Sequence, residues 1–282
     1  MPSPIWVAFI FLADTTDAIE TMMILSVIKP LYVLSGFLVG LLVGQTGVGG
    51  GSLMTPLLVL LFGIHPATAV GTDLLYAAST KTAGTLIHGM HGTVDWRLTR
   101  RLASGSIPAS VATLVILAVL NPQHRATAHF ISEMLGVVLI LTAVALVLRN
   151  RILAAGMSWF DDLDERRRMR LTVLLGVVLG VLVSITSVGA GAIGGVVLVL
   201  LYPRRRIATI VGSDIAHAVP LTLVAGTGYW IVGSVDWLML VSLLCGSIPG
   251  IAIGSAFSAR VPDAVLRPVL AATLLLAGAM VL

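Results

Sequence analysis

Two glycine-rich stretches interrupt long apolar segments and contain the residues best suited to bind a ligand. Glycine lets backbone N–H groups approach a ligand closely, and a helix that follows such a stretch presents further N–H groups and its positive dipole end. These features, with nearby hydroxyl groups, suit an anion. The candidate substrate-binding residues are Gln45, Thr46, Gly49, Gly50, Gly51 and Ser52 in the first stretch and Thr186, Ser187, Gly189 and Gly191 in the second. The alternative interpretation is that the glycines only let helices pack closely.

Lys81 is a charged residue in the middle of an apolar segment, and we add it to the substrate-binding candidates. An unpaired ammonium inside a membrane costs at least roughly 2.5 kcal/mol, so an anionic group should meet it. That group is either the substrate or Asp73, which lies eight residues earlier and therefore about two helical turns away on the same face.

Asp73, Asp214 and His217 are the candidates for proton coupling. Each carboxylate either carries a proton or caps the broken helix near it. His217 could titrate near neutral pH, but a histidine satisfied by hydrogen bonds in the protein interior is the alternative.

The sequence favours no metal, cofactor or catalytic centre. The first glycine stretch has no lysine after it, unlike a phosphate-binding loop, and the only cysteine, Cys245, has no nearby histidine. His88 and His91 are three residues apart without an acidic or thiol ligand. Asp95 and Asp236 each precede a tryptophan, a pattern typical of a helix cap at the membrane interface. We therefore expect no enzyme and no cofactor.

Composition places the chain in a lipid bilayer. Hydrophobic residues make up 57% of its 282 residues and charged residues 11%, against about 25% charged in a soluble domain. The net charge of +4 comes from arginines in short loops, which indicates membrane orientation and not nucleic-acid binding.

The chain contains an internal repeat. Gly92-Thr93-Val94-Asp95-Trp96 recurs as Gly233-Ser234-Val235-Asp236-Trp237, and Gly105-Ser106-Ile107-Pro108 recurs as Gly246-Ser247-Ile248-Pro249, both at an offset of 141 residues. We divide the chain into an N-terminal lead-in (1–21), a first membrane repeat (22–148), a charged cytoplasmic linker (149–170) and a second membrane repeat (171–282). Each repeat should contain about five helical segments, the second of which is too short to cross a bilayer.

The arginines favour repeats of inverted topology. With inverted repeats, fourteen basic residues lie on the cytoplasmic side and two outside, whereas parallel repeats give a split of ten to six. The sequence thus predicts an all-α polytopic membrane protein with two inverted repeats and broken or re-entrant glycine-rich elements, an architecture typical of secondary transporters.

The residues resemble the TauE/SafE family, also called the sulfite exporter or TSUP family. The resemblance rests on residues 36–52, 66–73, 89–96 and 105–108 and on their copies in the second repeat, where Ala190, Ala192 and the Arg204-Arg205-Arg206 run depart from the pattern. It implies a carrier in the bacterial inner membrane for sulfite, thiosulfate, sulfoacetate or another small anion. A passive anion channel or a membrane-embedded enzyme is the alternative, and association into a homo-oligomer is left open.

Overall fold

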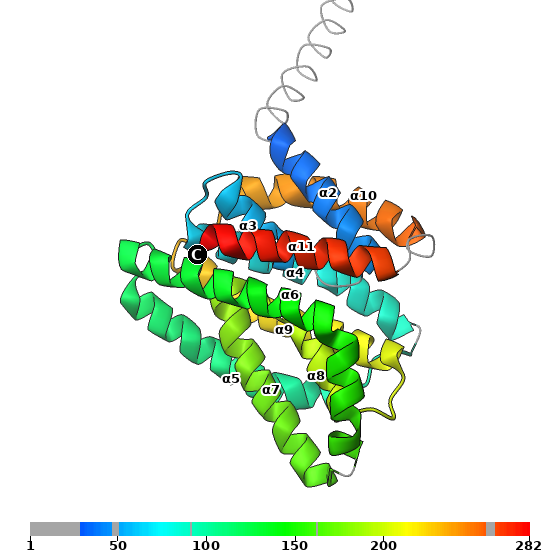
Figure 1. Cartoon of the computed structure of the whole chain (residues 1–282). Coiled ribbons are helices and arrows are strands. Elements are labelled where there is room, and N and C mark those ends of the chain that lie inside the picture. Colours follow the sequence, from blue (N-terminus) through cyan, green and yellow to red (C-terminus); the bar gives the residue numbers. More distant parts are fainter. Residues whose placement is uncertain (1–28, 47–50, 91, 162, 258–262) are drawn as a thin grey trace, which may run out of the picture.

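The computed structural model describes residues 29–46, 51–90, 92–161, 163–257 and 263–282, and in these residues it contains helices and no strands (Figure 1). The predicted lead-in, 1–21, lies outside the described residues. The first repeat forms α2 (Pro30–Thr46), α3 (Gly51–Leu60), α4 (Pro66–Met90), α5 (Trp96–Leu120) and α6 (Arg125–Asp161). The second forms α7 (Glu165–Thr186), α8 (Ile193–Leu201), α9 (Ile207–Ile231), α10 (Trp237–Phe257) and α11 (Asp263–Val281).

Five of these helices, α5, α6, α7, α9 and α10, are long and apolar enough to cross a membrane. The predicted all-α polytopic membrane fold is therefore confirmed. The two short segments are also confirmed, because α3 has 10 residues and α8 has 9. At about 1.5 Å per residue, each covers only about half of the hydrocarbon core of a bilayer.

The predicted linker is mostly helical. Helix α6 continues to Asp161 and α7 begins at Glu165, so little of the stretch 149–170 lies between helices. The many arginines in this stretch led to the prediction of a charged linker. Arginine is also a good helix former, so these residues are compatible with a helix.

Helices of one repeat pack on helices of the other through glycines. Along α2, Gly36, Gly40 and Gly44 face the backbone of α10, and a Cβ placed on Gly40 would lie 2.6 Å from the Ser247 carbonyl oxygen. Helices α5 and α7 meet in the same way, with Gly180 of α7 against the backbone of Ser106. Small residues at such spacing let membrane helices approach closely. Each repeat therefore packs closely against the other through more than one pair of helices.

Corresponding helices of the two repeats run antiparallel where they meet. Gly71, near the start of α4, lies against Tyr229 at the end of α9, while Gly212, near the start of α9, lies against the Thr93 carbonyl group that follows α4. Helices α6 and α11 likewise lie side by side and run in opposite directions in Figure 1. This packing agrees with inverted repeats, whose orientation across a membrane stays a prediction.

Repeated hydrogen bonds join the halves at both ends of the α4–α9 contact. The Asp95 N–H donates to Ser213 Oγ at 2.8 Å, and the Asp236 N–H donates to Thr72 Oγ1 at 3.0 Å. The Asp95 carboxylate accepts from the N–H groups of Arg97 and Leu98 at the start of α5. The Asp236 carboxylate accepts from the Met239 N–H at the start of α10. The predicted helix caps are confirmed.

Candidate functional site

Helices α4 and α9 bring four titratable residues of the membrane segments together. Asp73 and Lys81 come from α4, and Asp214 and His217 come from α9. Both carboxylates and the imidazole are buried, and Lys81 is half-buried. Lys81 lies within electrostatic reach of Asp214, Asp73 and His217. The substrate-binding candidate Lys81 and the three proton-coupling candidates therefore form one cluster.

Asp73 is held by groups from both repeats. The Thr55 hydroxyl of α3 donates to its Oδ2, which ties the short helix to α4. The Ser187 side chain, which follows α7, lies within interaction range of the same carboxylate. Its second oxygen, Oδ1, is buried and has no hydrogen-bond partner among the described residues. Asp73 thus supports the short helix and still has an oxygen available for a proton or another ligand.

Asp214 lies against the first turn of α8. A Cβ placed on Gly194 would be 3.1 Å from Asp214 Oδ1, so a side chain at this position would crowd the carboxylate. This oxygen is also buried without a hydrogen-bond partner in the described part of the chain. Lys81 is the nearby cation, although no ion pair within 4.0 Å joins it to either aspartate in the described residues. The cluster therefore holds its charges close together without pairing them directly.

The second glycine stretch has the backbone geometry of a ligand loop. Ser187 ends α7 in the left-handed conformation with φ +60°, and Gly189 has φ +120°, where glycine is strongly favoured. Within the described chain, the backbone N–H groups of Gly189, Ala190, Gly191 and Ala192 donate no hydrogen bond. A buried donor without a partner costs about 1–3 kcal/mol. Consecutive donors at the start of α8 are therefore suited to an anion.

The two hydroxyl groups of this stretch differ in availability. Thr186 Oγ1 donates to the Leu182 carbonyl oxygen at 2.7 Å and accepts from the Val188 N–H at 3.1 Å, so it completes the end of α7. Ser187 Oγ is buried, and among the described residues the polar group within its interaction range is the Asp73 carboxylate. Ser187 is thus the better placed hydroxyl donor for a ligand.

Much of the first glycine stretch lies outside the described residues, including Gly49 and Gly50. Gln45 and Thr46 end α2, while Gly51 and Ser52 begin α3. The stretch thus joins a longer helix to a short one, as its counterpart does in the second repeat. Its predicted role in binding stays a prediction.

The sequence analysis missed a pair of buried hydrogen bonds beside the cluster. His217 Nε2 lies 2.7 Å from Ser106 Oγ on α5, and Tyr76, the repeat counterpart of His217, donates to Ser247 Oγ on α10 at 2.8 Å. His217 Nδ1 is buried and has no partner in the described residues. Both serines belong to the repeated Gly-Ser-Ile-Pro motif, which was the available signal. Across the described ranges, the structure contains no group of three or more metal-ligating side chains.

Comparison with known proteins gives one family. The family model of the sulfite exporter TauE/SafE matches residues 32–281. A probable membrane transporter of Bacillus subtilis, YjnA, is 40% identical over 249 residues, which cover 87% of this chain and 96% of that protein. A second, YdhB, is 28% identical over 89% of this chain and 99% of its own length. A third, MJ0441 of Methanocaldococcus jannaschii, is 27% identical over 70% of each chain. No solved structure matches the chain.

Proposed function

This chain belongs to the sulfite exporter TauE/SafE family, and on that premise we propose that it is a secondary transporter of a small sulfur-containing or organic anion. The chain is a multi-pass membrane transporter, and its relatives YjnA and YdhB are named as probable membrane transporters. The proposed substrates are sulfite, thiosulfate and sulfonates such as sulfoacetate. The proposed location is the bacterial inner membrane.

The second glycine stretch carries this proposal. Among the described residues, four neighbouring N–H groups from Gly189 to Ala192 have no partner, and the Ser187 hydroxyl beside them is within interaction range of the Asp73 carboxylate. An anion bound there would be stabilised by several donors and by the positive end of the α8 dipole. In the proposed site, the first stretch contributes in the same way from the other repeat. The two half-helices would then meet near the middle of the membrane, where secondary transporters bind their substrates.

The charges beside this stretch support coupling of the anion to a cation. Asp73, Asp214 and Lys81 together carry a net charge of −1 when all three are ionised. A substrate anion would add to that negative charge in an environment where burying unbalanced charge is costly. Binding a proton at Asp73 or Asp214 would remove the imbalance. We therefore assign the two aspartates to proton coupling, with His217 as the neighbouring base that exchanges the proton.

The orientation of the two repeats follows the same proposal. Arg101 precedes the membrane part of α5 and Arg205 precedes α9, and both residues line one pocket. They therefore lie on the same side of the molecule, as inverted repeats require. The positive-inside rule then assigns this side to the cytoplasm.

The proposed binding role of the second stretch can be tested at Gly189. Alanine at φ +120° would strain the loop and move the neighbouring N–H groups, so anion binding by purified Gly189→Ala should weaken about tenfold or more. Gly195→Ala is the matched control, because Gly195 lies within α8 and no atom comes within 4 Å of a Cβ placed there. Equal thiosulfate and sulfite affinities in wild type and in both variants would exclude the stretch from the site.

A further inference from the structure

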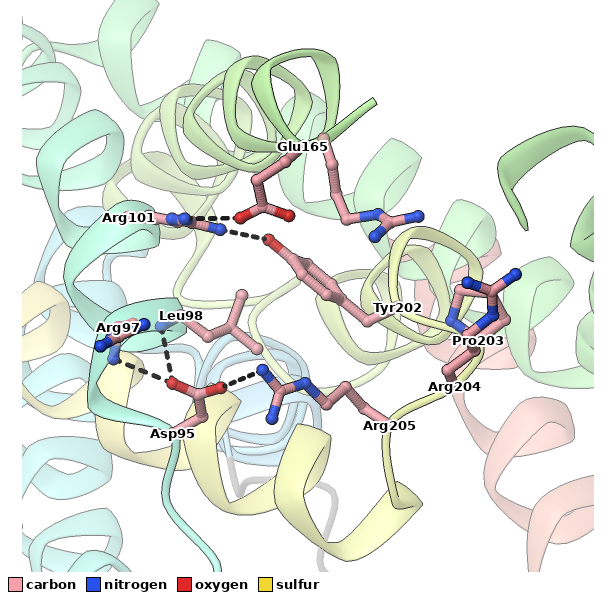
Figure 2. A pocket seen from close by; sticks show the side chains of 10 residues that line it. Asp95, Arg97, Leu98, Arg101, Glu165, Tyr202, Pro203, Arg204 and Arg205 are labelled. Carbon is pink, nitrogen blue, oxygen red and sulfur yellow. Dashed lines mark hydrogen bonds and ion pairs between the residues drawn. The ribbon is translucent and has the colours of Figure 1, made fainter. Parts of the chain in front are cut away.

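A second, strongly basic pocket lies away from the cluster described above. It is formed where the start of α5, the start of α7 and the loop between α8 and α9 meet, and it has a volume of about 140 Å³. Figure 2 shows arginines from these segments around Asp95 and Tyr202. The charged residues that line it are Arg97, Arg101, Arg168, Arg204, Arg205, Asp95 and Glu165. Five arginines and two carboxylates leave an excess of three positive charges.

Both carboxylates of this pocket already interact with residues of the chain. Glu165 Oε1 lies 2.7 Å from Arg101 Nη2, and Asp95 Oδ2 lies 3.3 Å from Arg205 Nη2 while its Oδ1 caps α5. In the described part of the chain, neither Arg97 nor Arg168 forms an ion pair with a carboxylate of the pocket. Arginines that only orient a membrane protein need no shared pocket, because each can extend into water.

Arg168 supplies the observation that points to a ligand. Its Nε is buried and has no hydrogen-bond partner in the described residues, although Nη2 donates to the Phe160 carbonyl oxygen at 3.4 Å. Its guanidinium lies 5.8 Å from the centre of the Tyr202 ring. The ring is held in turn by its hydroxyl, which lies 2.9 Å from Thr172 Oγ1 and 3.5 Å from Arg101 Nη1. A donor that is fixed in place and unpaired is suited to an oxyanion.

The repeat counterpart of this pocket lacks these charges. At the corresponding positions Arg97 is replaced by Leu238, Arg101 by Ser242 and Tyr202 by Phe62. There the Phe62 ring packs against Tyr32, with ring centres 4.8 Å apart. The fold therefore does not require a basic pocket at such a place. Among the described residues there, Lys29 is the cation, with Nζ 5.5 Å from the centre of the Tyr32 ring, so the cluster of arginines is found at one end of the molecule.

We propose that this pocket binds an oxyanion group of the phosphate or sulfonate type, at a site separate from the transport site. Its volume admits one such group with a few waters, since a water occupies about 30 Å³ in the liquid. Two sources share this chemistry, namely a free anion and the headgroup of an anionic phospholipid. The headgroup is within reach because Trp96 and Ile207 beside the pocket are exposed, as residues at a membrane interface are.

The test uses two binding measurements on the purified full-length protein. Calorimetry in non-ionic detergent measures inorganic phosphate and sulfate at constant ionic strength, and native mass spectrometry compares retention of phosphatidylglycerol with that of phosphatidylcholine. Arg97→Gln and Arg168→Gln should each weaken phosphate binding or phosphatidylglycerol retention about tenfold. Arg100→Gln is the matched control, because this exposed arginine of α5 does not line the pocket. Arg97 is exposed, so its variant remains informative if Arg168→Gln does not fold.

Each outcome decides the proposal or the source of the anion. Phosphate binding that is lost in Arg97→Gln without any change in lipid retention identifies a free anion as the ligand. Loss of phosphatidylglycerol alone identifies the headgroup. An equal loss in Arg100→Gln, or binding that is lost in Lys81→Met but kept in Arg97→Gln, would overturn the proposal. Absence of both kinds of binding in the wild-type protein would overturn it as well.

Discussion

His217 on α9 and Ser106 on α5 are joined by a buried hydrogen bond, with 2.7 Å between Nε2 and Oγ. In the other half, the corresponding hydrogen bond joins the Tyr76 hydroxyl to Ser247 Oγ at 2.8 Å. The fold thus keeps a hydrogen bond at both positions but places an imidazole, which can both accept and donate a proton, at only one of them. This difference motivates the first prediction.

We expect His217→Gln to abolish anion uptake driven by a pH gradient and to retain anion exchange at equal pH. Glutamine can keep the bond to Ser106 but cannot exchange a proton. Uptake into proteoliposomes with and without a gradient measures both activities. Tyr76→Phe is the control, because it removes the counterpart bond and leaves the imidazole of His217 in place. Unchanged gradient-driven uptake in His217→Gln, or equal losses in both variants, would reject the coupling role.

Lys81→Met should weaken anion binding about tenfold or more while the protein stays folded and inserted, because a charge-assisted hydrogen bond contributes about 1.5–3 kcal/mol. Calorimetric titration with thiosulfate measures this. Lys81 lies near both aspartates, so it could bind the substrate or neutralise a carboxylate. Two double variants, Lys81→Met with Asp214→Asn and Lys81→Met with Asp73→Asn, separate these roles. If either double variant recovers the transport lost in Lys81→Met, the lysine only neutralises a carboxylate.

Ser187→Ala and Thr186→Val should have different effects although the two residues are adjacent. Ser187→Ala removes a buried hydroxyl beside the Asp73 carboxylate and should raise the apparent KM about fivefold, which corresponds to about 1 kcal/mol. Thr186→Val removes the hydroxyl that completes α7 and should lower stability by about 1 kcal/mol with little change in KM. Transport kinetics and thermal unfolding of the same preparations check both. The opposite assignment of the two effects would exclude Ser187 as a ligand.

Inverted repeats predict which loops face the cytoplasm. In a Cys245→Ser background, Arg100→Cys and Arg206→Cys should react with a membrane-impermeant thiol reagent only from the cytoplasmic side, and Gln123→Cys only from the opposite side. All three native side chains are exposed. Labelling of intact cells and of inverted vesicles measures the accessibility. Reaction of Arg100→Cys and Arg206→Cys from opposite sides, as parallel repeats require, would contradict inverted repeats.

Much of the fold could be predicted because the repeat and the apolar pattern constrain it together. The helices that contain Asp73 and Asp214 begin and end close to where the sequence placed them. The end of α6 was harder to predict, because arginines such as Arg151 are compatible with both a loop and a helix. The repeat also located the Asp95 and Asp236 caps, since a carboxylate before a tryptophan recurs in both halves.

The candidate site could be predicted in its residue types but not in its contacts. Sequence spacing suggested Asp73 as the partner of Lys81, whereas the structure also brings Asp214 close, because α4 and α9 cross between repeats. Spacing within one helix cannot reveal such a neighbour. The availability of Ser187 and the engagement of Thr186 depend on where α7 ends, which propensity does not fix to within one residue.

Counterflow in proteoliposomes tests the central claim most directly. Vesicles that contain the purified protein are loaded with unlabelled thiosulfate or sulfite, diluted into the same labelled anion, and compared with vesicles loaded with chloride. A secondary transporter should show faster entry and a transient overshoot of label in the loaded vesicles, and Lys81→Met should lose both. Entry that is equally fast with either internal anion would identify a passive channel. No entry above that of protein-free liposomes for any of the proposed substrates would contradict the assigned substrate class.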